Sequence, residues 1–330
     1  MIGYTVRRVA QGILVLFLIS LATFALFHYG PENPAEAMCP AQRCTATRLD
    51  AITKNLGLDQ PAVTQYSEYM KGIFTGRTIG KGQGAKACPA PCFGYSFKYS
   101  VPVYGYLKGR LPATLSIAAG AAVIFLILGV AIGVVAARNR GRPFDRFTVG
   151  STLVVSAIPP YIVFLLSLLI VQQRWKLFPN PQYVSPFHSP LGWVKGMLLA
   201  WVVFGIYNAT AYARYSRGSM IDSLGEDYVR TARAKGLSER TVSLKHALRS
   251  AIAPVLTIFG LDVGGLLAGS FFIEYIFSIQ GIGLASLESI RTGDLPIIQA
   301  TVLLGTLFIV VANLLTDLAY SVVDPRVRLG

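Results

Sequence analysis

The segment SLGEDYVRTARAKGLSERTVSLKHALRSAIAP, residues Ser223–Pro254, is a dense polar stretch in an otherwise apolar chain. It carries six Lys or Arg and three acidic residues before Ser250, while long apolar segments run on both sides of it. Of the 330 residues, 53% are hydrophobic and 14% are charged, against roughly 25% charged in soluble globular proteins. Such a chain cannot bury its apolar side chains in one aqueous core, so we expect lipid to be its solvent.

Six segments are long and apolar enough to cross a bilayer, which needs about 20 residues. They lie near Val9–Tyr29, Leu111–Ala137, Thr148–Val171, Trp193–Ala213, Ile252–Ile276 and Pro296–Tyr320. The first could instead be a signal peptide, because Arg7 and Arg8 precede it and Ala35-Glu36-Ala37 follows it. Its apolar run of about 21 residues exceeds the 7–15 of a signal core, so we favour an uncleaved anchor. Pro159-Pro160 predicts a kink in the third span.

The distribution of basic residues predicts the orientation, because short cytoplasmic loops are enriched in Lys and Arg. Basic residues precede the first span, fill the loops after the second and fourth, and end the chain: Arg7, Arg8, Arg138, Arg140, Arg142, Arg146, Arg214, Arg217, Arg230, Arg233, Lys235, Arg240, Lys245, Arg249, Arg326 and Arg328. Both termini are therefore expected in the cytoplasm. The chain divides into residues 1–29 (tail and first span), an extracytoplasmic loop 30–110, and a core 111–330 with a cytoplasmic loop 214–251.

The four cysteines all lie in the long outer loop, as Cys39 and Cys44 in one cluster and Cys88 and Cys92 in another. Outside the cytoplasm thiols oxidise, so disulfides are favoured over a zinc site or free thiols. Three pairings are open. Pairing within each cluster is simplest, whereas a cross-link between clusters would close a longer loop and constrain the unfolded chain more. Two short helices, broken at Gly57 and Pro61, are also expected in this loop.

The polar segment 223–250 is predicted to form two short helices joined by a tight turn. Ser223 and Glu226 have the spacing of a capping box, and Gly236 suits the position just past a helix end. Ser238 is expected to cap a second helix from Glu239 to about Ser250. No face of the first helix is apolar enough to bury deeply, which suits docking to another protein. Packing beneath the chain's own spans and binding to anionic lipid heads are the alternatives.

Motifs along nearly the whole chain resemble the permease subunits of ABC importers of the dipeptide/oligopeptide and nickel family. The segment 227–237, DYVRTARAKGL, is similar to that family's cytoplasmic coupling motif. Four further segments match in order: LGLDQP at 56–61, RLPATLSIA at 110–118, EYIFSIQGIG at 274–283 and NLLTDLAYSVVDPRVR at 313–328. Gln280 stands where Pro is more usual, and the cysteine clusters are not part of the pattern.

This resemblance implies an all-α type I ABC importer permease in the plasma or inner membrane of a prokaryote. Two permeases would pair around a central pathway, with separate ATPase subunits holding ATP and Mg and a secreted binding protein delivering the substrate; this chain would bind no cofactor. A peptide is the expected substrate, and nickel or another small solute is the alternative. The resemblance assigns coupling to the ATPase to Glu226, Asp227, Tyr228, Arg230, Ala232, Arg233, Gly236 and Leu237.

Asp262 is the one carboxylate that the sequence places in the middle of a span. A charge there costs about 2.5–3.5 kcal/mol on insertion scales, so it should face protein or water. Gly265 and Gly269 share its helix face and leave room beside it. Asp262, Gly265 and Gly269 are therefore candidate pathway residues, and a structural hydrogen bond at an interface between permeases is the alternative role for Asp262.

Other classes of protein fit the sequence less well. There is no Walker sequence, because Gly80-Lys81-Gly82 lacks its flanking residues, and no His-Glu-x-x-His motif, which argues against an enzyme. His28, His188 and His246 are too scattered for a metal site. Basic residues that interrupt apolar spans do not favour nucleic-acid binding. Residues 277–295 are expected to be a short polar connection without a pore loop, unlike an ion channel, and a secondary transporter usually has more spans and internal repeats.

Overall fold

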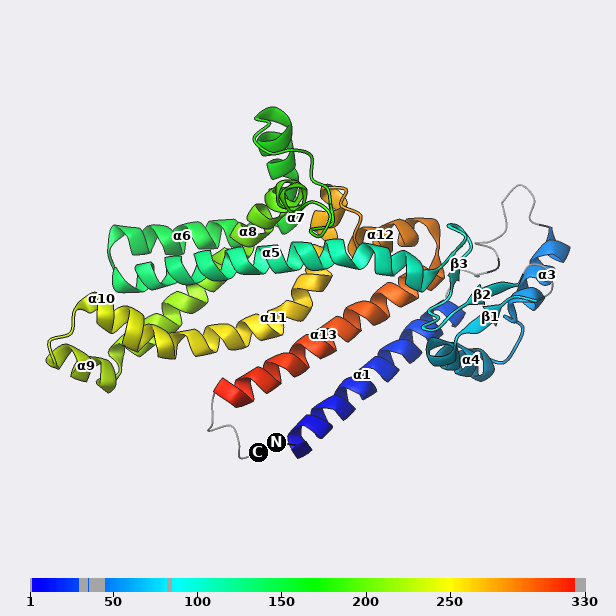
Figure 1. The fold of residues 1–330 in the computed structure, drawn as a ribbon, viewed down its shortest axis with the longest axis horizontal. Coiled ribbons are helices and arrows are strands. Elements are labelled where there is room, and N and C mark those ends of the chain that lie inside the picture. Colours follow the sequence, from blue (N-terminus) through cyan, green and yellow to red (C-terminus); the bar gives the residue numbers. More distant parts are fainter. Residues whose placement is uncertain (1, 30–34, 36–44, 82–84, 324–330) are drawn as a thin grey trace. The chain divides into compact units, whose positions relative to one another are not determined.

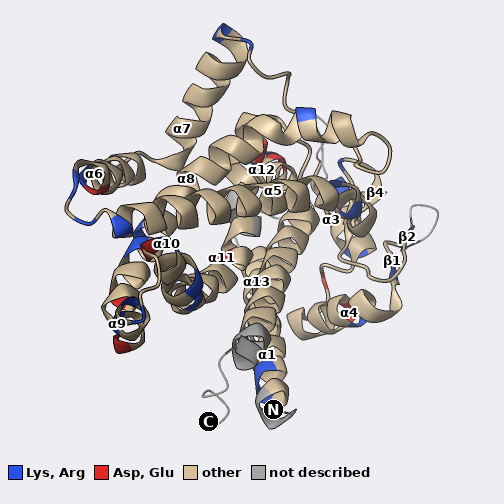
Figure 2. Cartoon of the chain, turned by 60° about the vertical axis from the view of Figure 1, so that its left-hand side comes forward, with Lys and Arg blue, Asp and Glu red and all other residues tan. Residues whose placement is uncertain are grey.

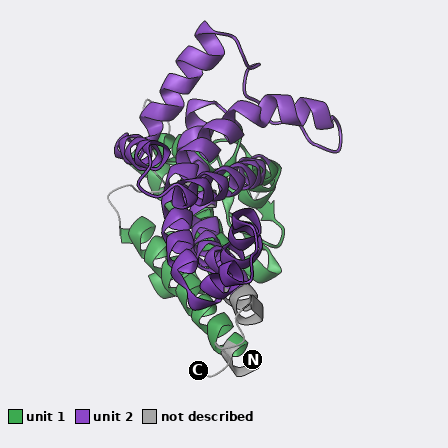
Figure 3. Ribbon diagram, turned by 90° about the vertical axis from the view of Figure 1, so that its left-hand side faces the viewer, with its two compact units in different colours: residues 1–112, 280–311 green, residues 113–279, 312–330 purple. Residues whose placement is uncertain are grey.

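The computed structural model describes residues 2–29, 35, 45–81 and 85–323, and it is largely helical (Figure 1). The chain divides into two compact units, which Figure 3 distinguishes by colour. Unit 1 contains residues 1–112 and 280–311, and unit 2 contains residues 113–279 and 312–330. Two long helices, α5 (Val103–Arg138) and α13 (Leu295–Val323), contribute to both units.

Unit 1 combines helices with two short antiparallel hairpins. Its helices, besides the first part of α5 and of α13, are α1 (Ile2–Tyr29), α3 (Ala46–Leu56), α4 (Ala62–Thr75) and α12 (Ile282–Thr292). Its strands are β1 (Arg77–Ile79) paired with β2 (Lys86–Cys88), and β3 (Tyr95–Ser96) paired with β4 (Val101–Pro102).

The break between α3 and α4 follows from two residues, as the sequence predicts. Thr45 begins α3 by accepting a hydrogen bond from the backbone N–H of Arg48 at 3.3 Å. Gly57 ends the helix with φ of 70°, a left-handed conformation that glycine adopts without a steric penalty. Pro61 then precedes α4. The two expected helices of the outer loop are therefore confirmed.

A small apolar cluster holds unit 1 together. Val103 and Leu107 of α5 are buried against Ala285 of α12 and against Ile297 and Ala300 of α13. These contacts pack the start of α5 against α12 and α13. The expected short polar connection at 277–295 is wrong, because α12 occupies most of it and buries one apolar side.

Unit 2 is a helical bundle with one sharply bent element. After α5 it contains α6 (Pro143–Ala157), α7 (Pro160–Leu166) with a π-helical continuation over Ser167–Arg174, α8 (Pro190–Gly225), α9 (Asp227–Ala234), α10 (Glu239–Thr241), a π-helical segment over Val242–Ala247, and α11 (Leu248–Ile276). The last part of α13 completes the unit.

Helices α5 and α8 of unit 2 approach closely because α5 carries glycine at the contact. A Cβ added to Gly129 would lie 2.6 Å from Cβ of Tyr212, and one added to Gly133 would lie 2.6 Å from the carbonyl oxygen of Ala213. Beside them, the rings of Phe125 and Tyr212 have centroids 4.5 Å apart. Gly129 and Gly133 therefore allow the close packing of these two helices.

In the described part of the chain, five helical segments are long and apolar enough to cross a membrane: Thr5–Tyr29, Val103–Arg138, Pro190–Gly225, Glu239–Leu266 and Leu295–Thr316. A sixth span is obtained if Pro143–Ala157 and Pro160–Arg174 are counted together. These two are bent by 95° at Pro159, where the sequence predicts only a kink. Five of the expected spans are thus single helices, and the third is broken.

Candidate functional site

The short helix α9 is the centre of the candidate site, and one side of it is buried. Val229 is 0% exposed and Ala232 is 6% exposed. They pack in one apolar cluster of unit 2 with residues from α5, α8, the π-helical segment 242–247 and the start of α11: Val134, Ala137, Met220, Val242, Ala247 and Ala251. The expectation that no face of this helix buries deeply is therefore wrong. Two small apolar residues at i and i+3 are enough to anchor an eight-residue helix.

The start of α9 also differs from the prediction. Ser223 lies inside α8 and is buried, and α8 continues to Gly225. The N-cap of α9 is Glu226, whose side chain makes no capping hydrogen bond, so the capping box is absent. Helix α8 is therefore longer than the expected span, and a bend at Glu226 directs the chain into α9.

The end of α9 matches the prediction in its turn chemistry. Gly236 has φ of 79°, and its backbone N–H donates to the carbonyl of Arg233 at 2.9 Å. The side chain of Ser238 then accepts a hydrogen bond from the backbone N–H of Thr241 at 3.4 Å and so caps α10. From Glu239 the chain continues in helical form through the π-helical segment into α11. Helix α9 is thus joined to α8 and α11 by short, hydrogen-bonded turns.

The outer side of α9 is exposed and charged. Tyr228 is 42% exposed and Leu237 is 39% exposed, and the remaining predicted coupling residues, except Ala232, are exposed as well: Glu226, Asp227, Arg230, Arg233 and Gly236. Arg230 pairs with Asp227 at 3.2 Å and Arg233 with Glu239 at 2.8 Å. Exposed ion pairs contribute little to stability, so these charges remain available to a partner.

Basic residues gather at the end of unit 2 that carries α9. Figure 2 shows Lys and Arg on α9, on α10 and in the turn between α5 and α6. The sequence places Arg138, Arg140, Arg142 and Arg146 in and beside that turn. One end of the unit is therefore strongly positive, while the apolar helices extend away from it.

An ion pair that the sequence analysis did not single out joins α6 to α8. The guanidinium of Arg217 donates to both oxygens of Asp145, with Nε 2.5 Å from Oδ1 and Nη2 2.8 Å from Oδ2. The backbone N–H of Gly141 donates to the same carboxylate at 2.9 Å. In the sequence, the one indication of this ion pair is that Asp145 is an acidic residue in the basic loop that follows the second span.

Of the candidate pathway residues, Asp262 lies on α11 and is exposed. The hydroxyl of Tyr212 donates a hydrogen bond to its Oδ2 at 2.8 Å. Gly265 is exposed and has open space around it, because a Cβ there would meet nothing within 4 Å. Gly269 belongs to α11, but its surroundings are outside the described contacts. The structure therefore places Asp262 beside open space at Gly265.

A second carboxylate, that of Glu274, lies near the end of α11, away from the middle of the span that holds Asp262. Glu274 is 0% exposed, and its Oε1 accepts hydrogen bonds from Thr114 at 2.7 Å and Ser270 at 3.0 Å. Sequence reasoning placed Glu274 at the end of a span and gave it no role. The buried hydrogen bond that Thr114 donates to Glu274 joins α5 to α11.

The second cysteine cluster forms a disulfide between Cys88 and Cys92, which corresponds to the local pairing. Cys39 and Cys44 lie outside the described residues. Among the residues that are described, no group of three or more His, Cys, Asp or Glu side chains could hold a metal ion.

Comparison with known proteins identifies the family. Residues 129–329 match the family described as the binding-protein-dependent transport system inner membrane component, and residues 1–118 match the N-terminal part of such membrane components. A Brucella abortus protein named for a peptide transport system permease is 34% identical over 329 residues, and the dipeptide transport system permease protein DppB of Escherichia coli K12 is 34% identical over 351 residues. Each alignment covers 99% of this chain and 99% of the relative. The chain therefore belongs to the family of inner membrane components of binding-protein-dependent transport systems, and it is a multi-pass membrane protein.

Proposed function

We propose that this chain is the permease subunit of an ATP-driven peptide importer in the cell membrane of a prokaryote. It would form half of the translocation pathway beside a second permease. ATPase subunits, which would hold ATP and Mg, and a secreted substrate-binding protein would complete the transporter. Family membership and the peptide and dipeptide names of relatives aligned over almost the whole chain support this proposal.

The observation that carries the coupling role is the two-sided character of α9. Its outer side presents exposed charges and Tyr228, which suit a polar groove on an ATPase. Its inner side inserts Val229 and Ala232 into the cluster formed by α5, α8, the π-helical segment 242–247 and the start of α11. Because packed interiors are nearly incompressible, a displacement of α9 would move these helices as a rigid group.

The proposed orientation places α9 and both termini in the cytoplasm. The concentration of Lys and Arg around α9 supports this orientation, since cytoplasmic loops are basic. The segment 30–110 would then face the outside, and the Cys88–Cys92 disulfide suits an oxidising compartment.

The proposed pathway residues are Asp262, Gly265 and Gly269 on α11. An exposed carboxylate within an apolar helix is costly against lipid, so Asp262 should face water or a partner permease. Tyr212 holds one oxygen of this carboxylate and leaves the other available to a cation, such as the ammonium group of a peptide.

The proposed function is tested by transport in cells. A strain lacking this chain is complemented with it, and uptake of radiolabelled dipeptides, a tripeptide and nickel is measured. We expect complementation to restore peptide uptake and to leave nickel uptake unchanged. Restoration of nickel uptake alone would favour the alternative substrate, and peptide uptake that is insensitive to depletion of ATP would contradict an ATP-driven importer.

A further inference from the structure

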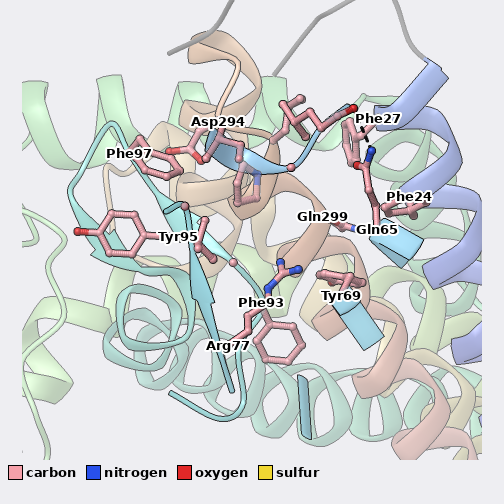
Figure 4. Close-up of a pocket in the computed structure, with 18 of the residues that line it drawn as sticks. Phe24, Phe27, Gln65, Tyr69, Arg77, Phe93, Tyr95, Phe97, Asp294 and Gln299 are labelled. Carbon is pink, nitrogen blue, oxygen red and sulfur yellow. Dashed lines mark hydrogen bonds between the residues drawn. The ribbon is translucent and has the colours of Figure 1, made fainter. Parts of the chain in front are cut away.

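A cavity of about 710 Å³ lies within unit 1 (Figure 4). It is bounded by the end of α1, the turn between α3 and α4, strands β1 and β3, and the turn between α12 and α13. Sites that bind small molecules usually enclose about 300–1,000 Å³, so this cavity is large enough for one.

Aromatic side chains form much of the cavity wall. Phe24 and Phe27 come from α1, Phe93 precedes β3, and Tyr95 and Phe97 lie on or just after β3. Figure 4 shows these rings around the same space. The wall is thus suited to an apolar or aromatic group on a ligand.

Three buried polar groups in the wall lack a hydrogen-bond partner among the described residues. They are Nε of Arg77 on β1, the hydroxyl of Tyr69 on α4, and the amide nitrogen of Gln299 on α13. The guanidinium carbon of Arg77 is 5.4 Å from the centre of the Tyr69 ring, and Gln299 lines the same cavity (Figure 4). Each of the three can donate to an anion. A buried donor left unsatisfied costs about 1–3 kcal/mol, which a bound acceptor would remove.

Among the described residues, no acidic side chain of the cavity forms an ion pair with Arg77. Asp294 is held by Ser96, whose hydroxyl donates to Oδ2 at 2.5 Å, and it caps the start of α13 through the backbone N–H of Ile297. Glu68 is exposed and forms no ion pair with Arg77. Burial lowers the pKa of the Arg77 guanidinium, and the nearby charge of Glu68 opposes this shift only in part.

We propose that this cavity binds the C-terminal carboxylate of a short peptide. Arg77, assisted by Gln299 and Tyr69, donates to the carboxylate, because a guanidinium matches the planar geometry of that group. The rings of Phe24, Phe93 and Tyr95 surround the last side chain of the peptide. The proposal rests on the peptide-importer function above, and it adds a substrate site between the segment that we place outside the membrane and the adjoining ends of α1 and α13.

The test measures binding to the full-length chain in nanodiscs of neutral lipid. Isothermal titration calorimetry compares the dipeptide Ala-Phe with its C-terminal amide, which keeps the side chains but lacks the carboxylate. We expect the amide to bind at least tenfold more weakly. Arg77→Gln should weaken Ala-Phe binding at least tenfold and abolish the difference between acid and amide. Lys98→Gln, which removes an exposed cation lining the same cavity, should change the affinity less than twofold.

Three results would overturn the proposal. They are no detectable binding of Ala-Phe, equal affinity for acid and amide, and acid-selective binding that survives in Arg77→Gln. Arg77 also packs against Gly72 and Tyr69, so Gln299→Leu provides a second variant that should weaken acid binding while keeping the fold. If complemented cells take up peptide while the isolated chain does not distinguish acid from amide, this inference fails and the transport function stands.

Discussion

Arg217 and Asp145 form a bidentate ion pair that connects α8 to the first turn of α6. The Asp145 side chain is 5% exposed and that of Arg217 is 26% exposed, so the pair is largely shielded from water. The N–H of Gly141 donates a third hydrogen bond to the carboxylate. This geometry fixes the short basic turn between α5 and α6 to the helix that leads into α9.

Removing one partner of this pair should strongly destabilise the protein. In Arg217→Gln the carboxylate of Asp145 stays buried without its counter-charge, at a cost of about 3 kcal/mol. We expect a clear drop in the melting temperature of the purified chain. The matched control is Arg230→Gln, which breaks the exposed pair with Asp227 and should cost less than about 1 kcal/mol. Equal melting temperatures for the two variants would show that the buried pair contributes no more to stability than the exposed pair.

Gly236 should be sensitive to substitution through its backbone alone. Its φ of 79° costs a non-glycine residue about 1–2 kcal/mol, although a Cβ would meet nothing within 4 Å. We expect Gly236→Val to alter the turn after α9 and to reduce peptide uptake at least tenfold at normal membrane levels. Gly218→Ala is the control, because that glycine is helical and also has open space. Normal uptake by Gly236→Val would mean that the turn does not transmit motion.

The role of Asp262 can be separated from that of its hydrogen bond. Asp262→Asn removes the charge, whereas Tyr212→Phe removes only the donor at 2.8 Å and keeps the buried ring. If the charge contacts the substrate, Asp262→Asn should lower uptake about tenfold while Tyr212→Phe keeps most of it. The kinetics of labelled dipeptide uptake give the comparison. A larger defect in Tyr212→Phe would identify the aspartate as structural.

Ala232 is buried, so a large substitution at this position should disturb the packing of α9 and not only its contact with an ATPase. Ala232→Arg would force a charged side chain into the cluster with Met220 and Val229, so its main effect should be on stability. We expect this variant to be recovered from membranes in much smaller amounts than Arg230→Glu, which alters only the exposed side of α9. Similar amounts of both, measured by immunoblot, would contradict the observed packing.

The sequence predicted the features that depend on composition and local turn chemistry. Apolar length located the spans, Gly57 and Pro61 located the break in the outer loop, and Gly236 located the end of α9. Features that depend on tertiary packing were missed. Val229 and Ala232 are too small to mark an apolar helix face, and they are buried by α5, α8, the π-helical segment 242–247 and the start of α11.

The same distinction explains the missed polar contacts. Asp145 is unremarkable in a loop with four arginines until α6 brings it beside Arg217. Glu274 is close to a predicted helix end, and only the packing of α11 on α5 buries it beside Thr114. The cavity at Arg77 likewise joins five separate segments of the chain, and no local pattern in the sequence links them.

The central claim is that the exposed side of α9 contacts a separate ATPase, and site-specific photocross-linking tests it most directly. A benzophenone amino acid replaces Tyr228 in the assembled transporter, and the control carries it at Val63, an exposed residue of α4 in the proposed outer loop. The account predicts a covalent adduct with the ATPase from position 228 and none from position 63. An assembled, active transporter that gives no ATPase adduct from position 228 would contradict it.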